Sequence, residues 1–191
     1  MLLLLALRAS AQTATVAVQV YDRIGLSPLA LQSFVNQTQE IFSEAGLSIH
    51  IDICGGASPC VVRSTFARIL ILRIMPGRSR KMKNALRSPL GQSFADHRGG
   101  TYASLFFETV QQQAADMDVP WLTVLSYAAA HEIGHLLLGD QAHTVLGLMK
   151  AQWDKNDFVD MKQNRLHFIR DQARLLTRCC ASLSVETVGE R

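Results

Sequence analysis

The sequence predicts an α+β domain in which a twisted mixed β-sheet of four to five strands packs against three helices. Two observations carry this prediction. Short alternating apolar runs near the start are separated by an amphipathic stretch, and an almost wholly apolar stretch at residues 121–138 has the length of a core helix. With 191 residues, 48% of them hydrophobic, the chain is long enough to bury one sizeable core.

The first half of the chain predicts a strand, a helix and a second strand. Residues 13–21 and 48–54 alternate apolar and polar side chains, as half-buried strands do. Between them, Ser27 followed by Pro28 is typical of a helix start, and apolar residues recur at helical spacing up to Gly46, a typical helix stop. This order predicts a parallel pair of strands joined by a right-handed crossover.

The second half predicts a central strand, further strands and two helices. Residues 68–75 are nearly continuously apolar, which is typical of a strand covered on both faces. The elements expected after it are, in chain order, a basic loop (78–83), a short edge strand (90–94), a strand (101–107), the apolar helix ending at Gly139, a charged loop (154–160) and an amphipathic closing helix (164–180). The later strands are close enough in sequence to join as a meander.

The start of the chain has features of a secretion signal. Residues 1–11 combine a short apolar run with small residues at Ala9 and Ala11, the form of a signal-peptidase site. The run is shorter than usual and no basic residue precedes it, as expected if the natural start lies further upstream. We therefore expect a secreted or periplasmic protein, with one folded domain at residues 12–180 and a C-terminal tail at residues 181–191.

Composition and cysteine content narrow the environment further. The formal net charge is only +3, so no nucleic-acid partner is expected, and no other apolar run approaches the length of a membrane span. Cys54 and Cys60 bracket a turn-rich loop that a disulfide could close. Cys179 and Cys180 are adjacent, so their pairing stays open.

The apolar helix carries the motif His131-Glu132-x-x-His135. Residues four apart lie one above the other on a helix, so both imidazoles can bind one zinc ion. The glutamate between them can take a proton from a water molecule held at that ion. Two imidazoles and a carboxylate on a core helix would be costly without such partners. Gly134 costs about 1 kcal/mol against alanine inside a helix, which predicts a packing reason for it.

A third ligand is expected just after the helix. Gly139 is a natural helix stop and His143 follows it, which would complete three protein ligands and leave an open position, the pattern of a catalytic zinc site. Asp140 is the rival, since some zincins, the metallopeptidases that this motif resembles, use an aspartate after the glycine. We prefer His143, since Asp140 follows the helix stop directly and could instead be a solvated polar cap.

These residues resemble a zincin metallopeptidase, and most closely the matrixin-like members of the metzincin clan. The resemblance rests on the following motifs: His131-Glu132-x-x-His135 with Gly139 and His143, the Met-turn-like Gly147-Leu148-Met149, and the edge-strand-like run Leu90-Gly91-Gln92-Ser93-Phe94 before Gly99-Gly100. The clan pattern is H-E-x-x-H-x-x-G-x-x-H, whereas here the glycine comes one residue late and the third histidine two residues late. The helix would have to be one residue longer and the loop one residue wider.

The resemblance implies a cleft beneath an edge strand, where an extended peptide pairs with that strand. Met149 would form an apolar floor under the metal. Leu90, Gly91 and Gln92 would bind substrate from the edge strand, and Trp153 would either line the pocket wall on the primed side or belong to the core.

The expected function is therefore a secreted zinc-dependent endopeptidase that holds one catalytic Zn²⁺ and uses Glu132 as general base. Its partner would be an extended peptide or protein substrate. Two alternatives are a non-catalytic extracellular zinc-binding domain and a zinc amidase that acts on a non-protein amide. The intact Glu132 argues against the first, because a binding domain needs no carboxylate there.

Overall fold

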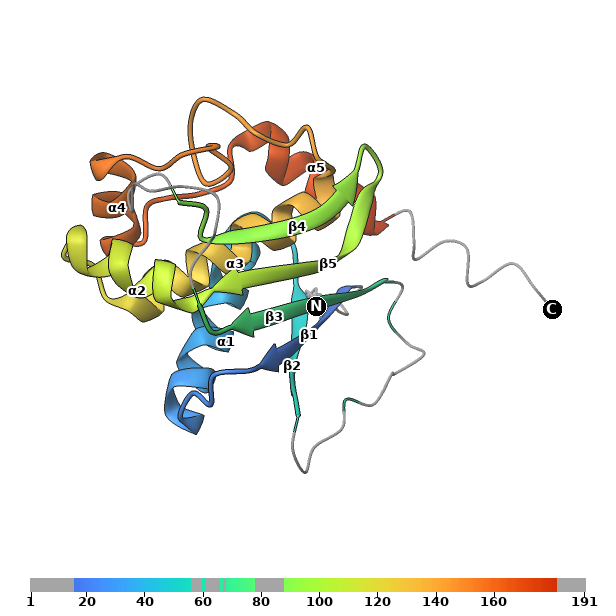
Figure 1. The fold of residues 1–191 in the computed structure, drawn as a ribbon. Coiled ribbons are helices and arrows are strands. Elements are labelled where there is room, and N and C mark those ends of the chain that lie inside the picture. Colours follow the sequence, from blue (N-terminus) through green and yellow to red (C-terminus); the bar gives the residue numbers. More distant parts are fainter. Residues whose placement is uncertain (1–15, 56–59, 61–65, 67, 78–87, 182–191) are drawn as a thin grey trace, which may run out of the picture.

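The computed structural model describes residues 16–55, 60, 66, 68–77 and 88–181. Within them the chain forms a five-stranded mixed sheet with helices, which confirms the predicted fold class (Figure 1). The predicted signal peptide, the basic loop at 78–83 and the tail after residue 181 lie outside the described residues. No helix in the described part of the chain has the length and apolar character needed to cross a membrane.

The sheet has the strand order β2-β1-β3-β5-β4. Its strands are β1 (Val16–Asp22), β2 (Ile49–Cys54), β3 (Arg68–Met75), β4 (Gly91–Asp96) and β5 (Gly99–Phe106). All neighbouring pairs are parallel except β4 and β5, which form an antiparallel hairpin. The expected meander is wrong at one point, because the chain passes from β3 to the outer position of β4 and then returns to place β5 beside β3. This leaves β4 at the edge of the sheet, as predicted.

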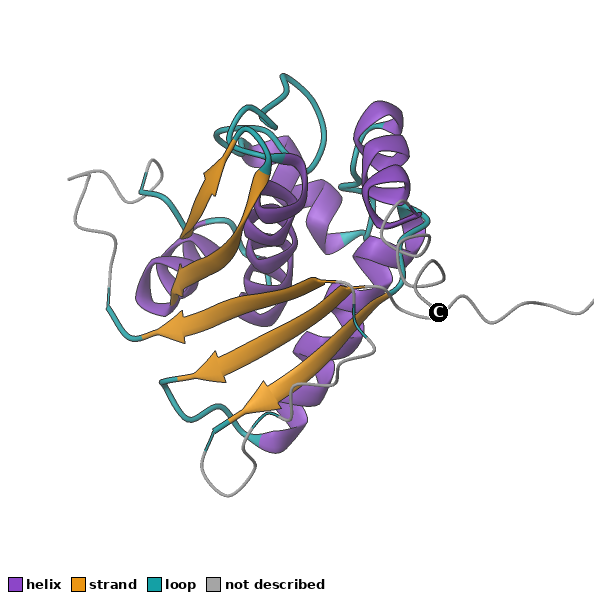
Figure 2. Cartoon of the chain, turned by 90° about the vertical axis from the view of Figure 1, so that its right-hand side faces the viewer, coloured by secondary structure: helices purple, strands orange, loops and turns teal. Residues whose placement is uncertain are grey.

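The helices lie mainly on one side of the sheet (Figure 2). They are α1 (Pro28–Glu44), α2 (Phe107–Asp116), α3 (Trp121–Leu138), α4 (Lys155–Lys162) and α5 (Arg170–Ala181). Helix α1 begins as predicted, with the Ser27 hydroxyl accepting the Ala30 N–H at 3.2 Å. Helix α3 packs against α1, β4 and β5, and it ends at Gly139, whose φ is +95°.

The core lies between the sheet and this helical layer. In β3, Leu70, Leu72 and Ile74 are fully buried, whereas Arg73 between them is exposed. The expectation that β3 is covered on both faces is therefore wrong. Its second face also carries apolar side chains, and these are only half-buried, which is why the run looked continuously buried in the sequence.

Two boundaries in the C-terminal third differ from the sequence prediction. The expected charged loop at 154–160 is instead α4, because the Asp154 carboxylate accepts the backbone N–H groups of the first turn and Asp157 accepts the Asp154 N–H in return. The closing helix begins at Arg170 rather than at residue 164. Asn164 has a φ of +52°, and residues 165–169, between Asn164 and α5, are not helical.

Cys54 and Cys60 form a disulfide, which closes the loop as their spacing allowed. Cys179 and Cys180 lie in α5, and their side chains are outside the described part of the structure.

Gly99→Ala should destabilise the fold by about 3 kcal/mol, because a Cβ there would add overpacking to an unfavourable backbone conformation. That Cβ would lie 2.4 Å from the Leu136 carbonyl oxygen at a φ of +102°. Gly25→Ala is the matched control, since its φ of +74° is also positive but nothing lies within 4 Å of the added Cβ. It should cost only about 1 kcal/mol. Urea unfolding measures both values, and equal losses would contradict the proposed close contact.

Candidate metal centre

Helix α3 supplies the candidate site from the centre of the core. Almost every side chain from Val124 to Leu137 is buried, so the helix cannot rotate to expose its histidines. Gly134 has the expected packing reason, because a Cβ there would lie 2.6 Å from the sulfur of the fully buried Met149. The missing side chain lets the methionine pack directly against the helix between the two histidines.

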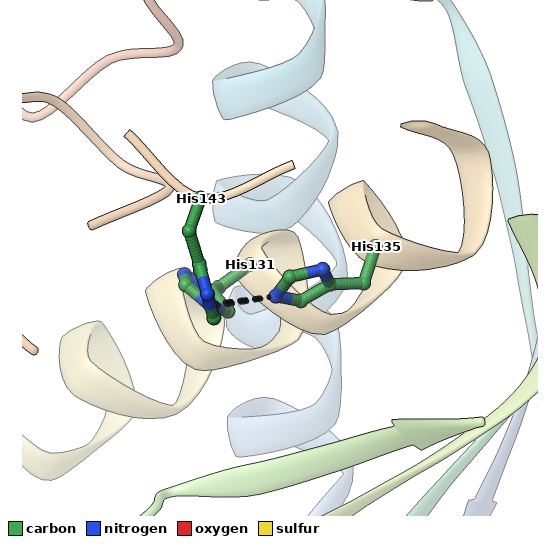
Figure 3. Close-up of side chains that lie close together, drawn as sticks. All are labelled: His131, His135 and His143. Carbon is green, nitrogen blue, oxygen red and sulfur yellow. Dashed lines mark hydrogen bonds between the residues drawn. The ribbon is translucent and has the colours of Figure 1, made fainter. Parts of the chain in front are cut away.

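Three imidazoles converge on one point (Figure 3). The Nε2 atom of His135 lies 3.2 Å from Nε2 of His131 and 3.0 Å from Nε2 of His143. Tetrahedral zinc bound at 2.0–2.1 Å would separate two ligand nitrogens by about 3.3 Å. The donor set and its spacing therefore fit a zinc ion. Asp140 is not part of this group.

The ring tautomers also fit a cation. The Nδ1 atom of His131 donates to the Leu148 carbonyl oxygen at 2.9 Å, and Nδ1 of His135 donates to the Gly139 carbonyl oxygen at 3.2 Å. Burial lowers the pKa of His131 to about 3 and also lowers that of His135, so both rings are neutral. A neutral ring protonated on Nδ1 has only a lone pair on Nε2, so two lone pairs face each other at 3.2 Å. A metal ion placed between them turns this repulsion into coordination.

The unusual histidine spacing is accommodated by the loop after α3. The helix runs to Leu138, and Gly139 turns the chain against the carbonyl oxygens of Asp96 and His97 at the tip of the β4–β5 hairpin. The Asp140 N–H donates to the Asp96 carbonyl oxygen at 3.0 Å. This contact fixes the start of the wider loop, and His143 then reaches back over the helix.

The residues after the loop hold His131 from the other side. The Leu148 carbonyl oxygen accepts both His131 Nδ1 and, at 3.0 Å, the indole Nε1 of Trp153. The Trp153 ring meets the His131 ring edge-on, with ring centroids 5.5 Å apart. Sequence reasoning assigned Trp153 to the cleft wall and missed Leu148, whose backbone function leaves no signal in its side chain.

Glu132 lies beside the histidines and is only 8% exposed. Burial raises its pKa to about 7, and hydrogen bonding from the Ser93 hydroxyl and N–H opposes that rise. A Cβ on Gly91 would lie 2.6 Å from Cγ of Glu132, so the glycine makes room for the glutamate against β4. Sequence reasoning did not single out Ser93, although its position next to Gln92 on the predicted edge strand was a signal.

A cleft of about 460 Å³ contains the site. The cleft is lined by the edge strand β4, by α3 with His131, Glu132 and His135, and by the segment at residues 150–153. The four residues predicted to bind substrate, Leu90, Gly91, Gln92 and Trp153, all line this cleft.

The other three histidines lie apart from the site. His50 pairs with Asp52 at 3.0 Å and His167 with Glu44 at 2.9 Å, while His97 is exposed in the hairpin turn. Each of the three is therefore a surface residue.

His143→Ala should weaken zinc binding by more than about a hundredfold, because loss of even an outer hydrogen-bond partner weakens metal sites by 10–100-fold. Asp140→Ala should keep the affinity of the unaltered protein, since Asp140 lies outside the converging group. His97→Ala is the matched control for loss of an imidazole. Calorimetric zinc titration measures all three, and metal loss in Asp140→Ala alone would make Asp140 the third ligand.

Glu132→Gln should change how the stability of the metal-free protein depends on pH. The folded pKa of about 7 exceeds the ordinary 4.5, so the folded chain retains a proton that the unfolded chain releases. The stability linked to this proton is complete below about pH 4.5 and is lost as the pH rises through about 7. Glutamine does not titrate, so the variant does not lose stability in this way. Its free energy of unfolding, relative to that of the unaltered protein, should therefore rise by on the order of 3 kcal/mol over that pH range. The histidines titrate in both proteins and cancel in the difference. Urea unfolding of both proteins with a chelator, at about pH 4.5 and pH 8, measures this difference in the free energy of unfolding. The same difference at both pH values would contradict the prediction.

Comparison with known proteins shows the fold. No protein-family model matches the sequence, and no curated protein matches it significantly. Among solved structures, archaemetzincin from Methanopyrus kandleri matches with a TM-score of 0.56 at 16% identity, over 89% of this chain and 98% of its own. Metalloproteinase-II from Bacteroides fragilis matches with a TM-score of 0.49 at 11% identity, over 90% of this chain and 55% of its own. The first likeness shows that this chain has the fold of an archaemetzincin.

Proposed function

We propose that this chain is a secreted zinc-dependent endopeptidase of the metzincin-like zincin type. The observation that carries the proposal is the convergence of three Nε2 atoms beside a buried glutamate, in a cleft with a strand edge along one wall. Three histidines leave one position of a tetrahedral ion open, which is typical of catalytic zinc. The archaemetzincin fold agrees with this proposal. The Cys54–Cys60 disulfide agrees with secretion, because disulfides persist in oxidising compartments.

Zinc, when bound, would supply a Lewis acid that polarises the scissile carbonyl and lowers the pKa of water. His131, His135 and His143 would hold the ion through their converging Nε2 atoms. Glu132 accepts a proton from the attacking water and delivers it to the leaving amine. In the metal-free chain, burial raises the pKa of Glu132 to about 7. Gly91 and Ser93 keep its carboxylate beside the strand that binds substrate.

The substrate would bind as an extended chain along β4. This strand pairs with β5 on one side only, and residues 91–93 line the cleft on the other. A free strand edge offers backbone donors and acceptors to any peptide, so it binds the main chain independently of sequence. Trp153 also lines the cleft. This arrangement favours polypeptides over small amides, which cannot use a strand edge.

Glu132→Gln should retain zinc and lose about 10²–10⁴-fold in kcat, because it removes the group that transfers the proton. The measurement is digestion of a broad peptide library with the zinc-loaded protein, with and without a chelator, followed by mass spectrometry. Glu108→Gln is the matched control, since Glu108 lies on α2 and does not line the cleft.

The alternatives give different results in the same experiment. Zinc binding without chelator-sensitive cleavage would favour a non-catalytic zinc-binding domain. Cleavage confined to small amides would favour an amidase. Full activity in Glu132→Gln would remove this residue from the proposed mechanism.

A further inference from the structure

Asp140 is the residue of the motif that the proposed mechanism leaves without a role. It lines the cleft, and it is exposed. Its backbone is fixed by the hydrogen bond to the Asp96 carbonyl oxygen. Its carboxylate has no hydrogen bond or ion pair with any residue in the described part of the chain. It is also not part of the converging metal group.

The charge of the cleft depends on this carboxylate. Apart from Glu132 and the histidines, the lining residues include two charged side chains, Asp140 and Lys150. The Lys150 ammonium is bound by Asp154 at 2.7 Å and by Asp157 at 2.5 Å, so its charge is already compensated. Among the described lining residues other than Glu132 and the three histidines, Asp140 is therefore the charged side chain without an ion-pair partner, and its charge is negative.

The position of Asp140 indicates which part of a substrate would meet it. Strand β4 runs from the Leu90 end of the cleft to Asp96, whose carbonyl oxygen accepts the Asp140 N–H. Antiparallel pairing is slightly more stable than parallel pairing. A peptide antiparallel to β4 would place its amino-terminal side at the Asp96 end. Its residues before the scissile bond would then lie closest to Asp140.

We propose that Asp140 is a specificity-determining residue that selects a cationic group on the amino-terminal side of the scissile bond. The cation is either an arginine or lysine side chain or the free α-amino group of the peptide. The proposal rests on the proposed peptidase function. An exposed ion pair of this kind contributes up to about 1 kcal/mol, which corresponds to about a fivefold preference.

The test compares acetylated, amidated peptides that carry either arginine or its neutral analogue citrulline at one position, scanned along the peptide. Mass spectrometry locates the cleaved bond, and kcat/KM gives the arginine-to-citrulline ratio. We expect a ratio of about five when arginine precedes the cleaved bond, and about one in Asp140→Asn. Asp171→Asn is the matched control, because Asp171 is exposed on α5 and does not line the cleft. It should keep the ratio of the unaltered protein.

A second arm separates the two sources of the cation. Peptides without arginine or lysine are compared with a free and with an acetylated amino terminus. If peptides with a free amine are preferred and Asp140→Asn removes that preference, the selected cation is the α-amino group. If arginine is preferred over citrulline and Asp140→Asn removes that preference, the selected cation is the side chain. A ratio near one in both arms, or a preference that survives Asp140→Asn, overturns the proposal.

A third measurement keeps the inference distinct from the proposed activity. Dye-labelled forms of the same peptides are titrated with the Glu132→Gln variant and with the double variant that also carries Asp140→Asn. Fluorescence polarisation gives the dissociation constants. If no peptide is cleaved by the unaltered protein, the peptidase proposal fails. The Asp140 proposal is then tested by the ratio of the dissociation constants of the neutral and the cationic peptide. This ratio should be about five with Asp140 and about one without it.

Discussion

The site depends on the forced approach of three imidazole nitrogens. His131 and His135 are tied at Nδ1 to backbone carbonyls, which directs their Nε2 lone pairs toward each other. Rotation of either ring would break its Nδ1 hydrogen bond, and the His135 ring is also buried. Preorganisation of this kind lowers the stability of the metal-free protein. Binding of a cation would remove the repulsion and raise the stability again.

The hairpin formed by β4 and β5 contacts both the candidate metal site and the cleft. One strand of it is the wall of the cleft, while its tip contacts Gly139 and anchors Asp140 at the start of the ligand loop. The Arg68 guanidinium joins the hairpin to the last turn of α3, by donating to the carbonyl oxygens of Gly100 at 3.0 Å and Leu136 at 2.8 Å. The cleft wall and the third histidine are therefore positioned by the same element.

The sequence predicted most of the fold and the residues brought together on α3, because alternation, helical spacing and caps are local signals. It failed where a feature depends on three-dimensional context. The return of the chain to place β5 between β3 and β4 leaves no trace in hydrophobic periodicity. Helix α4 was overlooked because its signal is the cap at Asp154 rather than an apolar stripe. The carbonyl of Leu148 could not be found, since any residue can supply a backbone acceptor. The spacing of Gly139 and His143 predicted a longer helix and a wider loop, and the structure has both.

The shared carbonyl of Leu148 also gives the protein a built-in optical probe. Trp153 donates to the same oxygen as His131, so a cation on that imidazole would strengthen the His131 hydrogen bond and alter the surroundings of the indole. The second tryptophan of the chain, Trp121, packs edge-on against Phe107 at the far end of α3. Its emission would serve as an internal reference. In a metal-bound protein, the intrinsic fluorescence would thus contain one emitter beside the ion and one remote from it.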